Sequence, residues 1–208
     1  MKGADIMKRS EINAVIREAM ENFKRHCWVL PPNPVWDVTD FGLGDFNKFG
    51  LTLINLTDQP EYCEKLMYVR KGQVTPTHYH AKKKEDIICR WGVLAVEISS
   101  DKDAVSLQVN GEEREIPTGK PILLSAGERI TMERGIRHSF WAESEYAILG
   151  EVSTANDDEH DNFFDNPDIG RFSRIIEDEP ALVKLVNEKQ GKGLSYGYYE
   201  RKNIRNVQ

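Results

Sequence analysis

The amino-acid sequence predicts an all-β fold, a sandwich or barrel, with one helix added before it and a short helix after it. Between residues 36 and 153, short segments rich in β-branched and aromatic residues alternate with clusters of Gly, Pro, Asp and Asn. This pattern is typical of many short strands joined by turns. Long helical patterns do not separate these segments, which argues against a parallel βαβ sheet.

The first predicted element is an amphipathic helix over residues 8–28. Its apolar residues recur at the spacing of one helical face, namely Ile12, Val15, Ile16, Ala19, Met20, Phe23 and Cys27. Ser10 is the expected N-cap, because its hydroxyl can accept a backbone N–H of the first turn. The helix must end before Pro31, Pro32 and Pro34, which cannot continue a helix interior.

The barrel core, residues 36–153, contains several short runs that we predict as strands. They are Leu51–Leu56, Lys65–Arg70, Val93–Ile98, Val105–Val109, Pro121–Leu124, Ser139–Trp141 and Tyr146–Val152. The pair Asn110-Gly111 stands between apolar flanks and predicts a two-residue hairpin turn.

Residues 154–208 are expected to form a polar loop, a short helix and a tail. The stretch TANDDEHDNFFDNPDIGRF is too long for an ordinary turn, and loops of this length are usually functional or disordered. Its phenylalanines favour packing over disorder. A short helix is predicted from Pro180 to about Gln190. We therefore expect a single domain over residues 1–208, in which the polar loop closes over the barrel.

Composition and charge exclude several classes of function. The chain has 208 residues, of which 30% are charged, and no apolar run approaches the roughly 18 residues that a membrane span needs. A net charge of -6 disfavours nucleic acid and anionic membranes as partners. No signal or transit pattern is evident, so a soluble, cytoplasmic protein is expected. The three cysteines lack a CxxC pattern, which indicates reduced thiols.

Histidines indicate where the chemistry lies. His78 and His80 are two residues apart in a predicted strand, so their imidazoles face the same side. Glu85 follows after a short turn, and His138 stands where another turn enters a strand. Three imidazoles and a carboxylate suit Mn, Fe, Co, Ni or Zn rather than calcium. The alternative is a set of structural histidines, and this is the interpretation we favour for His26 on the helix and, as a solvent-exposed residue, for His160.

Two motifs in this region resemble the cupin superfamily. The first cupin motif, G(X)5HXH(X)3-4E(X)6G, is matched at Gly72, His78, His80, Glu85 and Gly92. The second, G(X)5PXG(X)2H(X)3N, is matched at Gly127, Gly135 and His138, whereas Glu133 replaces its proline and Ala142 its asparagine. The resemblance implies a cupin jelly-roll β-barrel with a metal inside it, held by His78, His80, Glu85 and His138.

The stretches HYHAKKKED and GEVSTANDDEHDN, with the N-terminal helix and the later IGRF, resemble the D-lyxose isomerase family. The resemblance implies interconversion of D-lyxose and D-xylulose, and often of D-mannose and D-fructose, through a metal-stabilised cis-enediol. It also implies Mn2+ as the metal and a homodimer as the assembly. Co2+, Zn2+ and Fe2+ remain open as metals, because first-row affinities follow the metal more than the site.

Four further residues are candidates for catalysis or sugar binding. A carboxylate on an apolar strand is costly if buried and unpaired, so Glu151 is either a residue at the barrel rim or the acid/base that moves the proton. Lys83 occupies the position of the family's active-site lysine and is expected to stabilise charge on the sugar oxygens. Asp161 and Arg171 could bind the distal hydroxyls, or else make hydrogen bonds within their loop and a surface ion pair.

Two other functions compete with the isomerase. An iron-dependent cupin dioxygenase is one, although the charged residues at 82–86 and 157–161 suit a polyol better than an apolar substrate with O2. A non-catalytic sugar-binding cupin is the other. The expected partner is in each case a small molecule, and for the isomerase it is a pentose or hexose.

Overall fold

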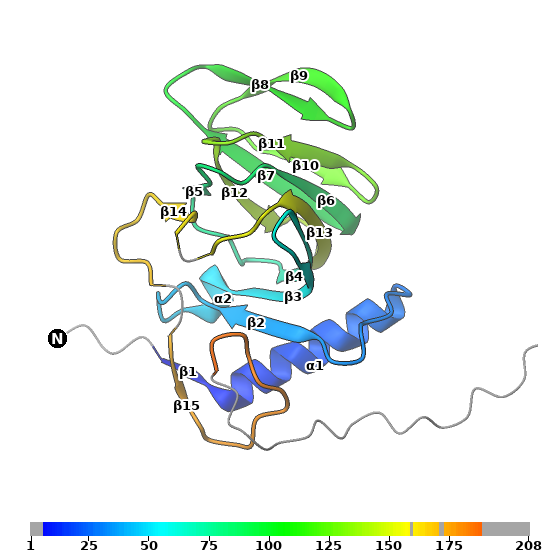
Figure 1. Cartoon of the computed structure of the whole chain (residues 1–208), viewed down its shortest axis with the longest axis vertical. Coiled ribbons are helices and arrows are strands. Elements are labelled where there is room, and N and C mark those ends of the chain that lie inside the picture. The colour runs from blue at the N-terminus through cyan, green and yellow to red at the C-terminus, as the bar shows by residue number, and fades with distance from the viewer. Residues whose placement is uncertain (1–5, 159, 171–172, 189–208) are drawn as a thin grey trace, which may run out of the picture.

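The computed structural model describes residues 6–158, 160–170 and 173–188 (Figure 1). Its helices are α1 (Arg9–Arg25) and α2 (Phe46–Phe49). Its strands are β1 (Ile6–Lys8), β2 (Val35–Thr39), β3 (Leu51–Asp58), β4 (Tyr62–Arg70), β5 (His78–Tyr79), β6 (Glu85–Trp91), β7 (Val93–Ser99), β8 (Ala104–Val109), β9 (Glu112–Pro117), β10 (Ile122–Ser125), β11 (Arg129–Met132), β12 (Arg137–Ala142), β13 (Tyr146–Thr154), β14 (Phe163–Phe164) and β15 (Arg174–Ile176).

Two antiparallel sheets enclose the main core. The larger has the order β2-β3-β4-β13-β6-β11-β8-β9 and the smaller the order β10-β7-β12-β5-β14. Apolar side chains from both sheets fill the space between them, among them Met67 and Leu149 from one sheet and Val96 and Phe140 from the other. The prediction of an all-β cupin jelly-roll barrel is confirmed, and each predicted strand lies within or overlaps an observed one.

The predicted hairpin is also confirmed. β8 and β9 pair in antiparallel register, and the two turn residues Asn110 and Gly111 have φ values of 56° and 82°. Both residues of a type I′ turn need positive φ, which Asn and Gly accept at low cost. The hairpin forms the far end of the larger sheet, opposite to α1 (Figure 1).

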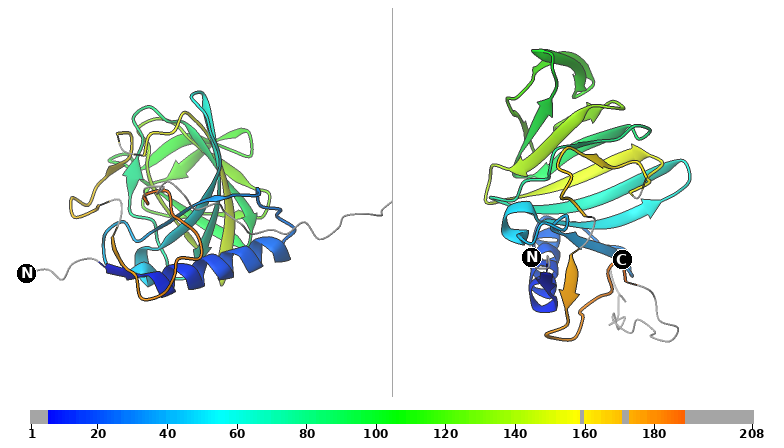
Figure 2. Two further views of the ribbon diagram at one scale, coloured as in Figure 1. Left: turned by 60° about the horizontal axis from the view of Figure 1, so that its bottom comes forward. Right: turned by 90° about the vertical axis from the view of Figure 1, so that its left-hand side faces the viewer.

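Helix α1 covers the outer face of the larger sheet at the end formed by β2, β3, β4 and β13 (Figure 2). Its apolar stripe packs on residues that alternate outward on β2, β3, β4 and β13, forming a second core. The outward residues are Trp36, Val38, Ile54, Leu66, Tyr68 and Ile148. Side chains of a strand alternate between its two faces, so the same strands leave their other residues for the barrel interior.

The predicted N-cap of α1, Ser10, is wrong by two residues. The N-cap is Lys8, whose backbone N–H bonds to the Glu11 carboxylate at 3.1 Å. Ser10 lies inside the first turn, where its hydroxyl donates to Asp178 at 2.6 Å. The acidic segment at residues 177–179 therefore binds the N-terminal turn of α1, as expected for negative charge at this end of a helix.

The predicted short helix after Pro180 is absent from residues 180–188. Turns occupy this stretch, and Leu185 forms a parallel bridge with Trp36. Leu185 is buried in the second core, and Glu188 binds the buried guanidinium of Arg9. Tertiary contacts with α1 and β2 have here overridden a local helical pattern.

The structure also bears on the expectations about thiols and membrane spans. Cys27, Cys63 and Cys89 are all free thiols, and the latter two are buried. Neither helix of the described residues has the length and apolarity to cross a bilayer.

Candidate active site

Strand pairing brings the motif histidines together inside the barrel. His78 on β5 lies directly opposite His138 on β12, and their ring centroids are 4.4 Å apart. His80 follows two residues after His78, as the strand spacing predicted, and the backbone N–H of Gly135 donates to its carbonyl at 2.7 Å. Gly135 has a φ of 79°, a conformation that a side chain would strain. The glycine of the second motif thus ties the two motifs to each other.

A backbone carbonyl accepts a hydrogen bond from Nδ1 of each of these histidines. The Nδ1–oxygen distances are 2.9 Å from His78 to Pro76, 2.5 Å from His80 to Asp161 and 3.0 Å from His138 to Ile136. Because a carbonyl only accepts, Nδ1 carries the proton, and Nε2 of the neutral ring keeps a free lone pair. Burial lowers the pKa of both His78 and His80, which favours the neutral, ligating form.

Glu85 completes the cluster from β6. One ligand atom each from His78, His80 and Glu85 lies within 4.8 Å of the others. Nε2 of His138 is 3.1 Å from Oε1 of Glu85. Burial opposes ionisation of Glu85, but the charge of Lys83 outweighs it and holds the pKa of this carboxyl well below the usual range. The carboxylate is therefore ionised at neutral pH.

Lys83 and Glu151 form a buried ion pair beside this cluster. Nζ of Lys83 lies 2.5 Å from Oε2 of Glu85 and 3.0 Å from Oε1 of Glu151. Burial alone would lower the pKa of Lys83, but the two carboxylates raise it, so the side chain is an ammonium. Glu151 is 7% exposed and lines the cavity, which favours the buried acid/base over a residue at the barrel rim.

A cavity of about 510 Å³ opens onto these residues. Its polar lining combines His78, His80, Lys83, Glu85 and Glu151 with Asp37, Thr39, Lys65, Thr75, Asp158 and Asn162. Its apolar lining includes Phe41, Met67, Phe140, Phe164 and Ile169. The volume suits a small molecule, and the many polar groups suit a substrate with several hydroxyls.

Asp161 lies at the edge of the site in a supporting position. Its carboxylate accepts the backbone N–H groups of Ala81, Lys82 and Lys83 at 2.8–3.1 Å, and it is 2% exposed. Its carbonyl also accepts from His80, as described above. These contacts favour hydrogen bonding within the loop over a contact with a sugar. Arg171 lies outside the described residues.

The remaining histidines stand apart from the cavity. His26 stacks on Trp91 with ring centroids 3.8 Å apart and bonds the Tyr146 hydroxyl at 2.8 Å. His160 is exposed and pairs with Asp157.

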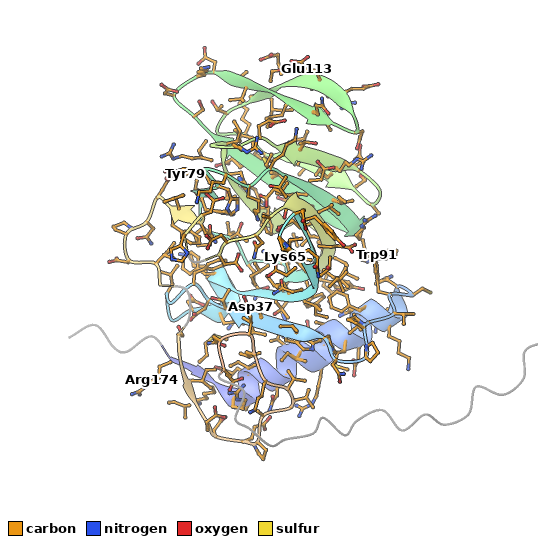
Figure 3. All side chains as sticks on the ribbon, viewed as in Figure 1. Asp37, Lys65, Tyr79, Trp91, Glu113 and Arg174 are labelled. Carbon is orange, nitrogen blue, oxygen red and sulfur yellow. The ribbon has the colours of Figure 1, made fainter. Side chains whose placement is uncertain are left out.

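Lys65 is the main cavity residue that the sequence analysis missed. It is 6% exposed on β4 and lies in the middle of the molecule, between the strands and the loop after β13 (Figure 3). A signal was present, because Lys65 falls in the same alternation as Cys63, Met67 and Val69, which face the interior. A charged residue in the inward series of an apolar strand indicates a functional or paired group.

The sequence matches the profile of the D-lyxose isomerase family over residues 33–189. The chain belongs to the D-lyxose isomerase family. A D-lyxose/D-mannose isomerase of Escherichia coli O157:H7 is 37% identical, with 88% of this chain and 98% of that protein covered. A D-lyxose ketol-isomerase of Cohnella laeviribosi is 30% identical, with 83% of this chain and all of that protein covered.

Solved structures of more distant proteins share the fold of this D-lyxose isomerase family member. L-ribose isomerase of Acinetobacter sp. DL28, in complex with L-ribose, has a TM-score of 0.64 at 19% identity and covers 84% of this chain. L-ribose isomerase of Cellulomonas parahominis has a TM-score of 0.65 at 17% identity and covers 83% of this chain. At this identity the likeness concerns the fold alone.

Membership of the D-lyxose isomerase family decides between the functions that the sequence left open. The chain is a sugar isomerase, and the competing interpretations as an iron-dependent dioxygenase or a non-catalytic sugar-binding cupin are wrong.

Proposed function

We propose that this enzyme interconverts D-lyxose and D-xylulose, and D-mannose and D-fructose, by moving a proton between C2 and C1. One observation carries the proposal: the Lys83–Glu151 ion pair contacts Glu85 and lines one cavity of about 510 Å³ together with His78, His80 and Glu85. The names of the relatives at 30–37% identity support these sugars as substrates.

We propose Mn2+ as the metal, with His78, His80, Glu85 and His138 as its ligands. Nε2 of His138 and Oε1 of Glu85 are 3.1 Å apart, and neither carries a proton in the neutral imidazole and the ionised carboxylate. A cation placed beside these two lone pairs would offset their repulsion in the buried site. A divalent ion here would polarise the sugar carbonyl and bind the neighbouring hydroxyl oxygen.

Glu151 is the proposed base. Its carboxylate removes the proton from C2 of the aldose, which leaves a cis-enediolate with its charge on the C1 oxygen, and then returns the proton to C1 to give the ketose. The proton of the C2 hydroxyl moves to the oxygen on C1, so the atoms balance without an oxidant. A carboxylate outside the ligand set serves this step because it can act first as base and then as acid.

Lys83 is proposed to stabilise charge on the sugar oxygens during this step. Its ammonium lies between Glu85 and Glu151, within reach of both, so it can donate to an oxygen on C1 or C2 as negative charge develops there. Asp161 is proposed to hold the turn at residues 81–83 through three backbone N–H groups, which fixes the direction of Lys83. A contact of Arg171 with distal hydroxyls, a homodimer and a single domain remain predictions.

The test is direct. The purified enzyme is stripped with a chelator, reloaded with Mn2+, Co2+, Zn2+ or Fe2+, and incubated with D-lyxose or D-mannose while ketose and dissolved oxygen are measured. We expect ketose from both sugars, the highest rate with Mn2+, and no oxygen uptake. Ketose formation that persists unchanged after complete metal removal would contradict the metal proposal. No ketose from either aldose with any of the metals would contradict the proposed substrates.

A further inference from the structure

Lys65 is a charged residue in the barrel wall that the proposed mechanism leaves unused. It lies directly across from Glu151 in the β4–β13 ladder, and residues paired in this way share one face of a sheet. Its ammonium is buried, and its long side chain takes an inward position that Leu or Met could fill at no electrostatic cost. An ammonium buried in this position needs polar partners that offset the free-energy cost of its burial.

Those partners come from the loop after β13 and from Glu151. Nζ of Lys65 donates to Oδ1 of Asn156 at 3.0 Å and lies 3.4 Å from Oδ1 of Asp158. It also lies 3.7 Å from Oε1 of Glu151. Lys65 therefore connects strand β4, in the floor of the cavity, to the loop after β13. It does so directly beside Glu151, the proposed base.

The two lysines approach the same oxygen of Glu151. Nζ of Lys83 is 3.0 Å and Nζ of Lys65 is 3.7 Å from Oε1. Both of these contacts involve Oε1, so Oε2 is the oxygen that we expect to face the cavity, which Glu151 lines. A carboxylate held at one oxygen by two ammoniums has a fixed direction for the other oxygen, and fixed direction is what a proton transfer between adjacent carbons requires.

We propose that Lys65 is a positioning residue for the isomerisation: anchored by Asn156 and Asp158, it holds Oε1 of Glu151 so that Oε2 faces C1 and C2 of the sugar. The inference rests on the proposed role of Glu151 as base. It also gives the two lysines different roles. Lys83 contacts the reacting oxygens, whereas Lys65 acts on the substrate only through Glu151.

The experiment compares Lys65→Met with wild type in D2O, using D-lyxose and the Mn2+ enzyme. Lys65→Met keeps the length of the side chain and removes its charge. We expect kcat to fall about 10- to 100-fold with KM changed less than about threefold, because the sugar still binds while the base is misdirected. We also expect more solvent deuterium at C1 of the ketose, because a mobile carboxylate exchanges its proton before returning it.

Lys71→Met is the matched control, since Lys71 is an exposed lysine directly after the same strand, and we expect wild-type kcat and deuterium content.

Asp158→Asn is the second variant, for the case that Lys65→Met does not fold. It weakens the anchor of Lys65 without leaving a hole, and should lower kcat severalfold with the same rise in deuterium. Wild-type kcat in the folded variant, or a lower kcat with unchanged deuterium content, would overturn the role of Lys65. Absence of ketose with the wild type itself would overturn the proposed function instead.

Discussion

The two faces of the larger sheet are built from the same strands but carry opposite kinds of residue. On β4, Leu66 and Tyr68 point outward to α1, whereas Lys65 and Met67 point into the barrel. On β2, Trp36 packs on the outer side while Asp37 lines the cavity. One face is an apolar surface closed by a helix, and the other is an apolar floor interrupted by charges.

The two faces contribute differently to the free energy of unfolding. Buried charges such as Lys83 and Glu85 are costly even when paired, and replacement of such groups by apolar residues often stabilises a protein. The core residues under α1 are apolar, with paired charges such as Arg9 and Glu188 only at its edge, and they supply a well-packed support for the strands. We infer that the outer face stabilises the sheet against which the inner charges are held in place.

The largest effect is expected at the inner face, with His78→Ala. Loss of one imidazole should lower the affinity for Mn2+ more than about 100-fold and remove ketose formation with it. The measurement is metal content after dialysis together with turnover of D-lyxose. His160→Ala is the control, because His160 is exposed outside the cavity and should change neither value. A His78→Ala protein that still binds one Mn2+ per chain with unchanged affinity would contradict the ligand assignment.

The next effect is expected for Glu151→Gln. The amide has the same shape but cannot take the proton from C2, so kcat should fall about 100- to 10,000-fold. Metal content should stay near that of wild type and the protein should stay folded, with a lower melting temperature because a buried ion pair is lost, which separates this change from that at His78. Turnover of D-lyxose at the wild-type rate would reject Glu151 as the base.

A substitution on the outer face should lower the stability of the protein and leave its activity nearly unchanged. Leu66→Ala opens a cavity under α1 and should lower the free energy of unfolding by about 2–5 kcal/mol. Below its melting temperature, the variant should keep kcat/KM for D-lyxose within about twofold. The adjacent Met67→Ala points into the barrel and should change both the stability and KM. If both variants changed KM equally, the two faces would not be functionally separate.

Much of this arrangement could be predicted from the sequence, because it follows from local patterns. Alternation along short segments predicted most of the strands, and the 3.6-residue period predicted α1. The spacing of His78, His80 and Glu85 predicted their convergence, and the resemblance to the second cupin motif added His138. Lys83 and Glu151 were predicted by resemblance and by a charge on an apolar strand.

What could not be predicted depends on contacts between distant residues. Asp161 binds three backbone N–H groups some 80 positions earlier in the chain, and no sequence pattern indicates such partners. The helix expected after Pro180 does not form within residues 180–188, because Leu185 and Glu188 are used in contacts with β2 and Arg9. Lys65 could have been found from its inward alternation, but its partners Asn156 and Asp158 could not.

The smallest effect concerns the polar edge of the outer face and depends on pH. Oε1 of Glu18 on α1 accepts from the Tyr68 hydroxyl at 2.7 Å, and its carboxylate pairs with Arg70. Burial raises the pKa of Glu18, but the hydrogen bonds from Arg70 and Tyr68 outweigh it and lower the pKa below its ordinary value. Such a group stabilises the fold above its unfolded pKa, and the contribution is lost as pH falls through the folded pKa.

Glu18→Gln should therefore lower stability at pH 7, and the difference from wild type should shrink as the pH falls below about 4. Because the side chain of Glu18 is 40% exposed, solvent screening limits the difference at pH 7 to under about 1 kcal/mol. Denaturant unfolding of both proteins across this pH range measures it, with Glu21→Gln, an exposed glutamate of the same helix, as the control. A difference that grows on acidification would show that the pKa of Glu18 is raised in the folded state, which would contradict the stabilising role of its hydrogen bonds with Tyr68 and Arg70.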